Sequence, residues 1–386
     1  MKKTLIVLMV LFLLAGCKPS ANEVKVKKHS GLWVTYNEIN QMLDSGFEEG
    51  MNTVIKNCQS LEINNLYFHV RAFGDAVYNS SIFPQNPKVK GYDFDILEYV
   101  INLCHENGIL VHAWINPYRI SNTTENVDEI DPQSPAYIWL KDDNPQNDKN
   151  VCIMDGIYLN PAESEVQQLI INGVREIVSR YNIDGIHFDD YFYPTQSVEF
   201  DSVSYNEYTA DNLQPLSLED WRRINVNSLL SGTYNAIKHV NEKVVFSVSP
   251  AASVENNYNN LYADVRAWVD NGYIDAIIPQ LYFGFNYPDQ NYKFLNLLKN
   301  WQDVAALNPD VKLYIGLAAY KANPSLDADK AEWQQNFDVI KRQVELADNN
   351  SNVNGYVYFS YSSLFSSEKP FKTQLKNLKD YIKTRK

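Results

Sequence analysis

Cysteine is scarce in this 386-residue sequence, and its scarcity excludes several kinds of protein. After the first residues only Cys58, Cys104 and Cys152 remain, an odd number without a close pair. A disulfide framework is therefore not expected, although one bridge remains possible. The sequence also lacks a glycine loop that would cradle phosphate and a Gly-x-Ser-x-Gly nucleophile elbow. We expect no cofactor and no serine triad.

Positive charge is also in short supply. The chain has 34 lysines and arginines against 47 aspartates and glutamates, which gives a net charge of -13. Basic runs are absent outside residues 18–28, so nucleic acids and other polyanions are not expected as partners. Aromatic residues make up 13% of the chain, a content that suits stacking on neutral sugars as well as a large core.

The N-terminus has the pattern of an exported lipoprotein. Two lysines precede an apolar run that is too short for a membrane span, and small residues then lead to Cys17. We expect residues 1–16 to be a signal peptide, residues 17–28 a tether lipidated at Cys17, and residues 29–386 one catalytic domain. This places the domain outside the cytoplasm, in the cell envelope, anchored to a bacterial membrane. The domain is expected to be a monomer.

Apolar strands alternate with helices of amphipathic spacing along the rest of the chain. This alternation predicts a parallel sheet, and eight repeats predict a single (β/α)8 barrel with long loops after the third and fourth strands. A doubly wound sheet is the alternative. The expected strands are 31–35, 65–70, 109–116, 185–190, 244–250, 275–283, 312–320 and 354–361, and the expected helices are 39–61, 94–107, 163–181, 218–240, 261–271, 292–307, 327–347 and 370–386.

Polar and aromatic residues gather where the expected strands end, which is the catalytic end of such barrels. The candidates for substrate binding are Arg71, His112, Trp114, Asn116, Tyr118, Arg119, His187, Tyr191, Tyr193, Gln280 and Tyr282. Each also has a structural reading. The two histidines could be hydrogen-bonded core residues, Arg71 could neutralise a buried acid, and Trp114 or Tyr282 could fill the barrel.

The fourth strand ends in two acids, Asp189 and Asp190, followed by an aromatic segment. Glycoside hydrolysis needs two carboxyl groups, one protonated as acid and one ionised as nucleophile or base. Strand parity points Asp189 inward beside His187, so Asp189 is the expected nucleophile or stabilising carboxylate. Adjacent residues rarely place their carboxyl groups on opposite sides of one sugar. Asp75 is therefore the leading candidate for the partner acid.

Two further expectations concern these acids. Glu163 and Glu255 stand behind Asp75 as alternative partner acids. Arg71 and His187 are expected to lower the pKa of Asp189 and keep its carboxyl group ionised. A metal site built from the two aspartates and a histidine is a weaker reading, because no HxH or HxxxH spacing accompanies them.

Six motifs together resemble the glycosyl hydrolase-like family 10 of bacterial lipoproteins. They are GLWVT (31–35), VRAFGDAVY (70–78), HAWINPYR (112–119), GIHFDDYFYP (185–194), WRRINVN (221–227) and DAIIPQLYF (275–283). The resemblance implies a glycosidase that cuts peptidoglycan glycan strands after the stem peptides have been removed. Its partners would be that polysaccharide and, through the lipid anchor, a membrane. The segment SPAASVENN after the fifth strand departs from the family pattern, so one sugar subsite is expected to differ.

Two other functions stay open, and a third is disfavoured. A lipid-anchored barrel could bind glycan without cutting it. It would then need the aromatic side chains at the strand ends, as a platform for sugar rings, but no acid pair. An amylase-like α-glucan hydrolase would explain His187 and Asp189, although no glutamate ends the fifth strand. The fourth strand is also similar to a chitinase motif, but Tyr191 stands where that motif has its catalytic glutamate.

Overall fold

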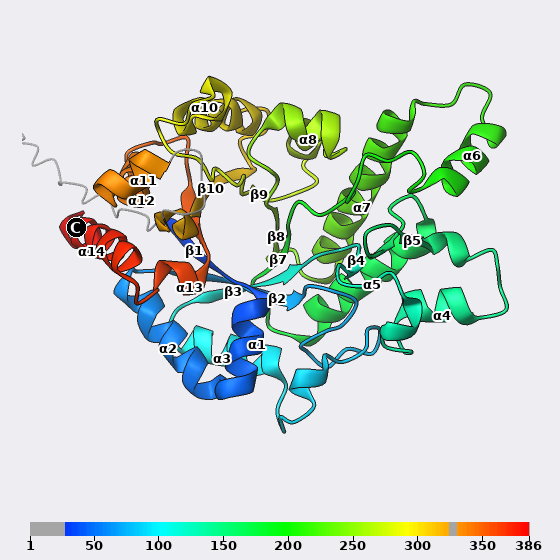
Figure 1. The fold of residues 1–386 in the computed structure, drawn as a ribbon, viewed down its shortest axis with the longest axis horizontal. Coiled ribbons are helices and arrows are strands. Elements are labelled where there is room, and N and C mark those ends of the chain that lie inside the picture. The colour runs from blue at the N-terminus through cyan, green and yellow to red at the C-terminus, as the bar shows by residue number, and fades with distance from the viewer. Residues whose placement is uncertain (1–27, 324–329, 386) are drawn as a thin grey trace, which may run out of the picture.

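Eight parallel strands close into a barrel in the computed structural model, which describes residues 28–323 and 330–385 (Figure 1). The strands neighbour one another in the order β1-β11-β10-β9-β8-β7-β3-β2, so each strand of the barrel lies beside the next one along the chain. They are β1 (His29–Val34), β2 (Asn65–Arg71), β3 (Leu110–Ile115), β7 (Gly185–Phe188), β8 (Val245–Val248), β9 (Ala276–Ile277), β10 (Lys312–Ala318) and β11 (Gly355–Phe359). The expected (β/α)8 barrel is confirmed.

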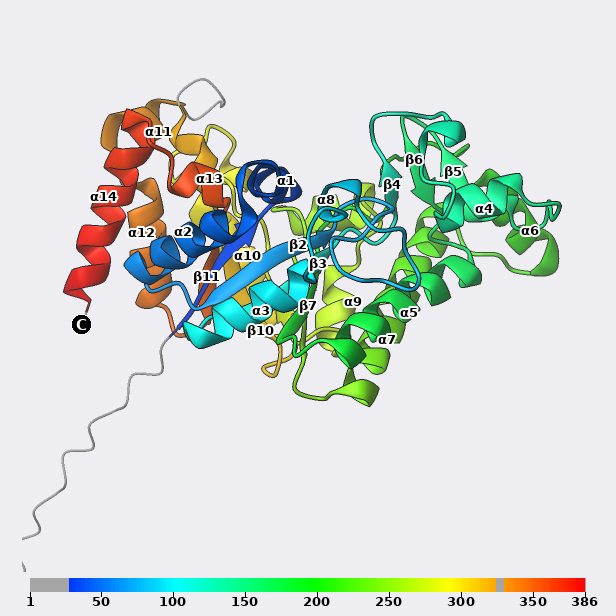
Figure 2. The same cartoon turned by 90° about the horizontal axis from the view of Figure 1, so that it is seen from below.

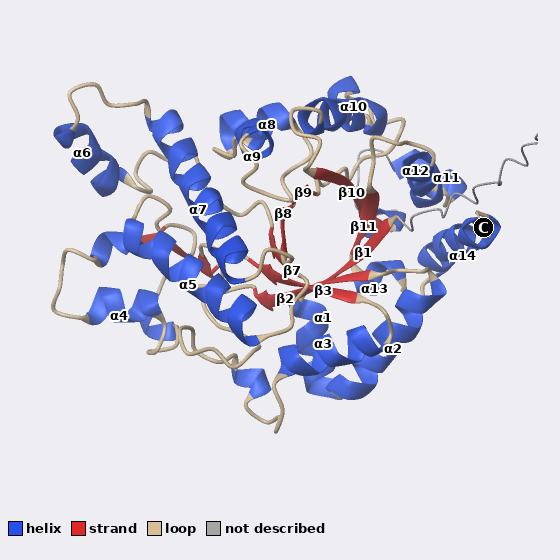
Figure 3. Cartoon of the chain, turned by 180° about the vertical axis from the view of Figure 1, so that it is seen from behind, coloured by secondary structure: helices blue, strands red, loops and turns tan. Residues whose placement is uncertain are grey.

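Helices surround this ring of strands, as Figure 3 shows. Each buries an apolar face on the outside of the barrel, which is why their sequences carry apolar residues at helical spacing. The helices of the ring are α1 (Tyr36–Ser45), α2 (Phe47–Ser60), α3 (Ile96–Glu106), α5 (Ser164–Arg180), α7 (Leu218–Val240), α9 (Val265–Asp270), α10 (Phe294–Ala305), α11 (Lys330–Asn336), α12 (Val339–Asp348) and α14 (Lys369–Thr384). At the start of α7 the Ser217 hydroxyl accepts a hydrogen bond from the Asp220 amide and so caps the helix.

Two helices expected to be continuous are each divided in two. The expected helix 39–61 breaks between α1 and α2 at Gly46, whose φ of 124° favours glycine. The expected helix 327–347 breaks between α11 and α12 near Phe337, which has a φ of 46°. Apolar spacing continues across both breaks, so periodicity alone could not reveal them.

The long connection after β3 is more regular than expected. Residues 120–161 read as irregular chain, yet they contain most of a three-stranded antiparallel sheet in the order β4-β6-β5. Its strands are β4 (Arg119–Ser121), β5 (Val151–Ile153) and β6 (Ile157–Leu159), accompanied by α4 (Pro135–Lys141). The connection after β7 adds α6 (Ser202–Asp211), which lies with this small sheet on one side of the barrel (Figure 2).

Shorter elements complete the connections. They are α8 (Val254–Asn260), α13 (Tyr361–Leu364) and the 3-10 turns Pro87–Val89, Val127–Glu129, Asp148–Asn150, Gln290–Tyr292 and Ala319–Ala322. Cys58, Cys104 and Cys152 are buried free thiols, so the single disulfide left open by the sequence does not form. The described residues contain no helix long and apolar enough to cross a membrane. The expected signal peptide and Cys17 lie outside the described residues.

The lower part of the barrel interior is packed with rings. Tyr67 stacks on His112 with ring centroids 4.4 Å apart, and the His112 Nε2 atom lies 2.9 Å from the Asn65 Oδ1 atom. His29 stacks on Tyr314 at 3.9 Å in the same region. Because this packing fills the barrel from below, open space remains only at the carboxyl ends of the strands.

Candidate functional site

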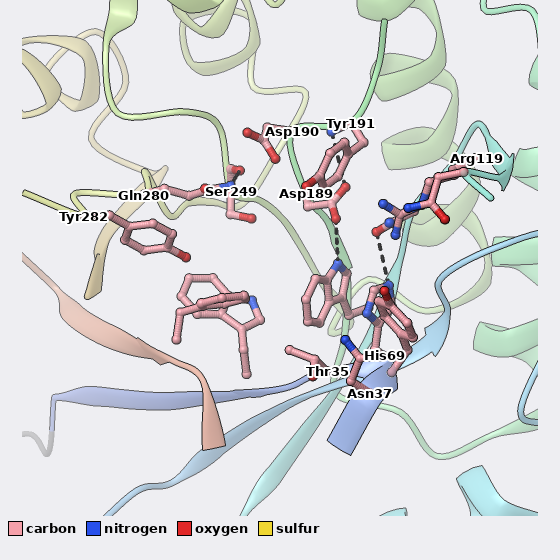
Figure 4. Close-up of a pocket in the computed structure, with 16 residues that line it drawn as sticks. Thr35, Asn37, His69, Arg119, Asp189, Asp190, Tyr191, Ser249, Gln280 and Tyr282 are labelled. Carbon is pink, nitrogen blue, oxygen red and sulfur yellow. Dashed lines mark hydrogen bonds between the residues drawn. The ribbon is translucent and has the colours of Figure 1, made fainter. Parts of the chain in front are cut away.

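A cavity of about 270 Å³ opens at the carboxyl ends of the barrel strands (Figure 4). We call it the central pocket. Residues from seven of the eight barrel strands, or from the loops that follow them, contribute to it. The lining residues are Trp33, Thr35, Tyr36, Asn37, His69, Trp114, Asn116, Arg119, Asn122, Asp189, Asp190, Tyr191, Ser249, Gln280, Tyr282 and Phe359. The pocket thus combines acids, aromatic rings and a single arginine.

Asp189 and Asp190 lie together in the wall of this pocket, directly after β7. Asp189 is 3% exposed, and its carboxylate accepts hydrogen bonds from the Trp114 indole N–H at 3.2 Å and the Tyr191 amide at 3.3 Å. The Asp190 carboxylate is hydrogen-bonded by the Gln280 side chain. Strand parity therefore placed Asp189 correctly, and the chain direction after the strand brings Asp190 to the same cavity.

Burial, and to a smaller extent repulsion from the neighbouring Asp190, together raise the pKa of Asp189 to about 8. Burial also raises the pKa of Asp190. Arg119 opposes both shifts, because its positive charge favours the ionised carboxylates. The expectation that Asp189 is held ionised is therefore wrong. Two acids in one buried site cannot readily ionise together, so the pair retains a proton near neutral pH.

Arg71 does not line the central pocket. Its guanidinium carbon lies 3.9 Å from the centre of the Phe83 ring, and a β-carbon on Gly173 of α5 would approach its Nη1 atom to 2.6 Å. The pairing of β2 with β3 shifts register between His69 and Arg71, which reverses the alternation of side chains at that point. Arg71 therefore packs between the barrel and α5, and Arg119 is the cation near the acids.

His69 occupies the place in the pocket that the sequence reasoning had given to Arg71. It stacks on Trp114 with ring centroids 3.7 Å apart, and its Nε2 atom lies 3.1 Å from the Asn116 Oδ1 atom. Burial lowers the pKa of His69 well below its usual value, and the charge of Arg119 adds to that effect. His69 is therefore a neutral ring. Its inward parity with Tyr67 in NLYFHVR was the signal that could have found it.

His187 and His112, both expected to bind substrate, lie beneath the pocket and do not line it. The Trp33 indole N–H donates to the His187 Nε2 atom at 3.1 Å, and the His187 Nδ1 atom lies 2.9 Å from the Ser247 hydroxyl. Burial lowers the pKa of both histidines. Both are therefore hydrogen-bonded core histidines, the structural alternative given for them above. His187 supports the floor of the central pocket through its hydrogen bond with Trp33.

The expected aromatic platform is partly in place. Trp114, Tyr191 and Tyr282 line the pocket, and Tyr191 is 52% exposed with the Arg119 guanidinium 4.8 Å from its ring centre. Tyr118 and Tyr193 are buried away from the pocket, since their strand-end positions turn them toward the outer core. The sequence reasoning missed Trp33, Tyr36 and Phe359, which complete the aromatic wall. Asn116, Arg119 and Gln280 line the pocket as expected.

The three candidates for a partner acid lie elsewhere. Asp75 lines a neighbouring cavity and accepts a hydrogen bond from the Asn86 side chain at 2.8 Å. Glu163 accepts a hydrogen bond from the Ser204 hydroxyl at 2.5 Å, and Glu255 lines a separate surface pocket beside α8. Among the described residues, Asp189 and Asp190 are the only acids that line the central pocket.

Comparisons with known proteins identify relatives of this chain. Residues 28–335 match the family described as Glycosyl hydrolase-like 10. The chain is 30% identical over 337 residues to Glycosyl hydrolase YngK of Bacillus subtilis (strain 168), covering 81% of this chain and 62% of that protein. It is 32% identical over 340 residues to Glycosyl hydrolase DigH of Escherichia coli (strain K12), covering 81% of this chain and 75% of that protein. The chain thus spans less than two thirds of the length of YngK.

A solved structure supports the fold independently. The glycoside hydrolase domain of PgaB (BpsB) from Bordetella bronchiseptica matches with a TM-score of 0.61 at 11% identity, over 91% of this chain and 98% of that domain. At so low an identity the likeness concerns the barrel architecture alone.

Proposed function

Because the chain belongs to the glycosyl hydrolase-like 10 family, as its motifs indicated, we propose that it hydrolyses glycosidic bonds of a cell-envelope polysaccharide. The substrate we propose is peptidoglycan glycan from which the stem peptides have been removed. One observation carries the proposal: the buried Asp189 and the half-buried Asp190 line one open pocket whose other walls combine aromatic rings with polar side chains. Two carboxyl groups with different proton affinities are what acid-assisted glycoside hydrolysis requires.

Asp189 is the proposed general acid. Its raised pKa keeps the carboxyl group protonated at neutral pH, so it can give a proton to the glycosidic oxygen as the bond to the anomeric carbon breaks. A water molecule then adds to the anomeric carbon, and the proton it loses returns to the Asp189 carboxylate. Asp190 supplies the negative charge that stabilises the positively charged sugar in the transition state. Arg119 and the Gln280 amide favour ionisation of Asp190, which keeps the two carboxyl groups in different protonation states.

The remaining wall of the pocket is suited to holding sugar rings. Tyr191, Tyr282 and Phe359, which are at least partly exposed, offer apolar faces on which the C–H face of a pyranose can stack. Asn116 and Asn37 place amide groups at the same wall, where sugar hydroxyl groups can pair with them. A sugar bound here would displace water from the acids and strengthen their electrostatic effect.

The proposed location follows from the N-terminal sequence. Residues 1–16 would direct export, and lipid on Cys17 would hold the barrel at a membrane of the envelope, next to peptidoglycan. We propose that the domain acts there as a monomer. Replacing Cys17 by serine should release the chain from membranes in cell fractionation. Continued membrane association together with labelling by a fatty acid would contradict the anchor.

The direct test uses a soluble chain that begins at Glu23. It would be incubated with purified peptide-free peptidoglycan glycan and, separately, with amylose, and the products would be analysed by mass spectrometry. Short muro-oligosaccharides that are absent with Asp189→Asn would support the proposal. Binding without products would favour a non-catalytic glycan-binding barrel, and products from amylose alone would favour an α-glucan hydrolase.

A further inference from the structure

A second cavity, of about 480 Å³, lies beside the central pocket, and we call it the side pocket. Tyr36 and Asn122 line both cavities, so the two share a wall at these residues. Phe73 also joins them, because its ring meets Tyr36 edge to face at 5.1 Å while the Arg119 guanidinium lies 4.7 Å from its centre. A ligand longer than the central pocket can therefore continue into the side pocket.

The walls of the side pocket are fixed by the backbone. Ala76 pairs with Gln85 in an isolated parallel bridge, and the Asn86 amide donates to the Ala76 carbonyl at 2.8 Å. On the facing side, the wall follows β4 and the segment from Asn122 to Ser134. Since neither side depends on a ligand for its hydrogen bonds, the cavity is preformed.

The lining of the side pocket carries charge of one sign only. Asp75, Glu129 and Asp131 contribute carboxyl groups, and neither lysine nor arginine is among the lining residues. The described residues contain no group of three or more acids, histidines or cysteines that could hold a metal ion, so the three acids do not form a metal site. The central pocket differs in having Arg119. Acids without a lysine or arginine in the same lining suit a ligand with hydroxyl groups and a positive charge.

Two buried polar groups of the side pocket show that it is adapted to a polar ligand. Ser134 is 2% exposed, and its hydroxyl has no hydrogen-bond partner among the described residues. The Asp75 carboxylate accepts a hydrogen bond from the Asn86 side chain, and burial raises its pKa. A buried hydroxyl without a hydrogen-bond partner destabilises the folded state. A small shift of the wall toward a bound sugar would recover part of that cost.

We propose that the side pocket is a second sugar subsite that prefers an amino sugar with a free, protonated amine. This inference rests on the proposed function, because the sugar would belong to the same glycan strand that is cut in the central pocket. Asp75 is then a binding residue and not the partner acid of Asp189. Phe73 supplies the apolar face of the subsite, and the three carboxyl groups attract the ammonium group.

The charge of the side pocket also sets what it rejects. In peptide-free peptidoglycan one sugar carries a free lactyl carboxylate, and the glucosamine that alternates with it is N-acetylated except where removal of the acetyl group has left a free amine. Three acids without a facing cation would repel that carboxylate, so only the glucosamine-type sugar fits. Because the two sugars alternate, occupancy of the side pocket fixes the register of the strand in the central pocket and thereby the bond that is cut.

The test compares two oligomers that differ only in their amines. Hexamers of glucosamine and of N-acetylglucosamine would be titrated calorimetrically into the Asp189→Asn chain, which removes turnover, at a pH where the free amines are protonated. The glucosamine hexamer should bind at least about fivefold tighter, and added salt should reduce that difference because it screens the carboxylates.

Further substitutions locate the effect. In the same background, Asp75→Asn and Asp131→Asn should each weaken binding of the glucosamine hexamer by about threefold to tenfold and leave the N-acetylated hexamer within about twofold. Asp131 is the second variant because it lies in a surface segment whose substitution is not expected to disturb folding. Asp93→Asn is the matched control, since Asp93 is exposed and lines neither cavity.

Several outcomes would overturn the inference. Equal affinity for the two hexamers, an equal loss for both in the variants, or binding of neither hexamer would each show that the side pocket is not an amino-sugar subsite. Hydrolysis of peptide-free glycan by the unmodified chain is measured separately. If hydrolysis is observed while the hexamers bind equally, the proposed function stands and the subsite fails.

Discussion

Two buried acid sites lie on either side of the same loop, and they are built in opposite ways. Asp201 forms an ion pair with Arg222 of α7, and both side chains are fully buried. The Arg222 Nε atom donates to one carboxylate oxygen of Asp201 at 2.9 Å, and the Nη2 atom donates to the other at 2.5 Å. Asp189, by contrast, is repelled by the neighbouring Asp190, and the positive charge of Arg119 favours ionisation of both carboxyl groups.

The difference separates a buried acid that stabilises the fold from acids that can take part in a reaction. Arg222 also donates to the carbonyl groups of Gln196 and Ser197, so the ion pair ties down the loop that follows the acid pair. A buried acid that is paired in this way has its negative charge compensated. An acid pair whose negative charge is not compensated by such an ion pair keeps a proton and can give it to a substrate. The WRRINVN motif thus carries a structural residue, and GIHFDDYFYP carries the reactive ones.

The largest expected effect comes from removing the acid. Asp189→Asn should lower kcat/KM on glycan by about 10³-fold, because general acid catalysis contributes about 10²–10⁴-fold. Progress curves with peptide-free glycan would measure this, and Asp93→Asn should keep the activity of the unmodified chain. Near-native turnover by Asp189→Asn would show that Asp189 and Asp190 are no more reactive than the ion-paired Asp201.

Breaking the ion pair should instead affect stability. Arg222→Met leaves Asp201 buried without its cation, which should cost about 3 kcal/mol of unfolding free energy. Urea unfolding would measure the loss, and Arg175→Met is the control because Arg175 is an exposed arginine of α5. Combining Arg222→Met with Asp201→Leu should restore part of the stability, since the charge that lacks a partner is removed as well. A double variant as unstable as the single one would contradict this explanation.

The cation beside the acid pair should tune its pH dependence. Asp189 acts in its protonated form, so kcat/KM should fall as the pH rises through about 8. Arg119 lowers the pKa of Asp189, and Arg119→Met should therefore raise that pKa and move the alkaline limb to higher pH. Profiles of kcat/KM against pH for the two proteins would show the shift. An alkaline limb displaced to lower pH in Arg119→Met would contradict the assignment of protonated Asp189 as the active form.

The smallest expected effect is a gain in stability when the Asp189 carboxyl group is replaced by an amide. The pKa of Asp189 is raised from 3.8 to about 8 by folding, so the folded state binds more protons than the unfolded state between these values. Its contribution to stability therefore declines as the pH rises through this window. Asp189→Asn removes the decline and should add at least about 1 kcal/mol above pH 8. Thermal unfolding at two pH values would measure it, and an equal effect at pH 4 would argue for another cause.

The sequence was informative about this site wherever local geometry decides. Alternation along β7 placed Asp189 at the barrel mouth, and the strand-end rule correctly brought Trp114, Asn116, Arg119, Gln280 and Tyr282 to one cavity. The same rule failed at Arg71, because the register shift in β2 leaves no mark in the hydrophobic pattern. Apolar periodicity likewise failed to reveal the helix breaks near Gly46 and Phe337, because apolar spacing continues across each turn.

By itself the sequence determined the alternation of eight strands and helices, the edge of the sheet that carries polar groups, and the family. These are properties of side-chain period and local motif. Only the tertiary structure decided that the acids share a buried wall, that Asp75 belongs to a neighbouring cavity, and that Arg119 is the cation near the pair. Proton affinity depends on burial and on neighbours that are distant along the chain, such as Trp114 and Gln280. The order of residues does not contain that information until the barrel closes.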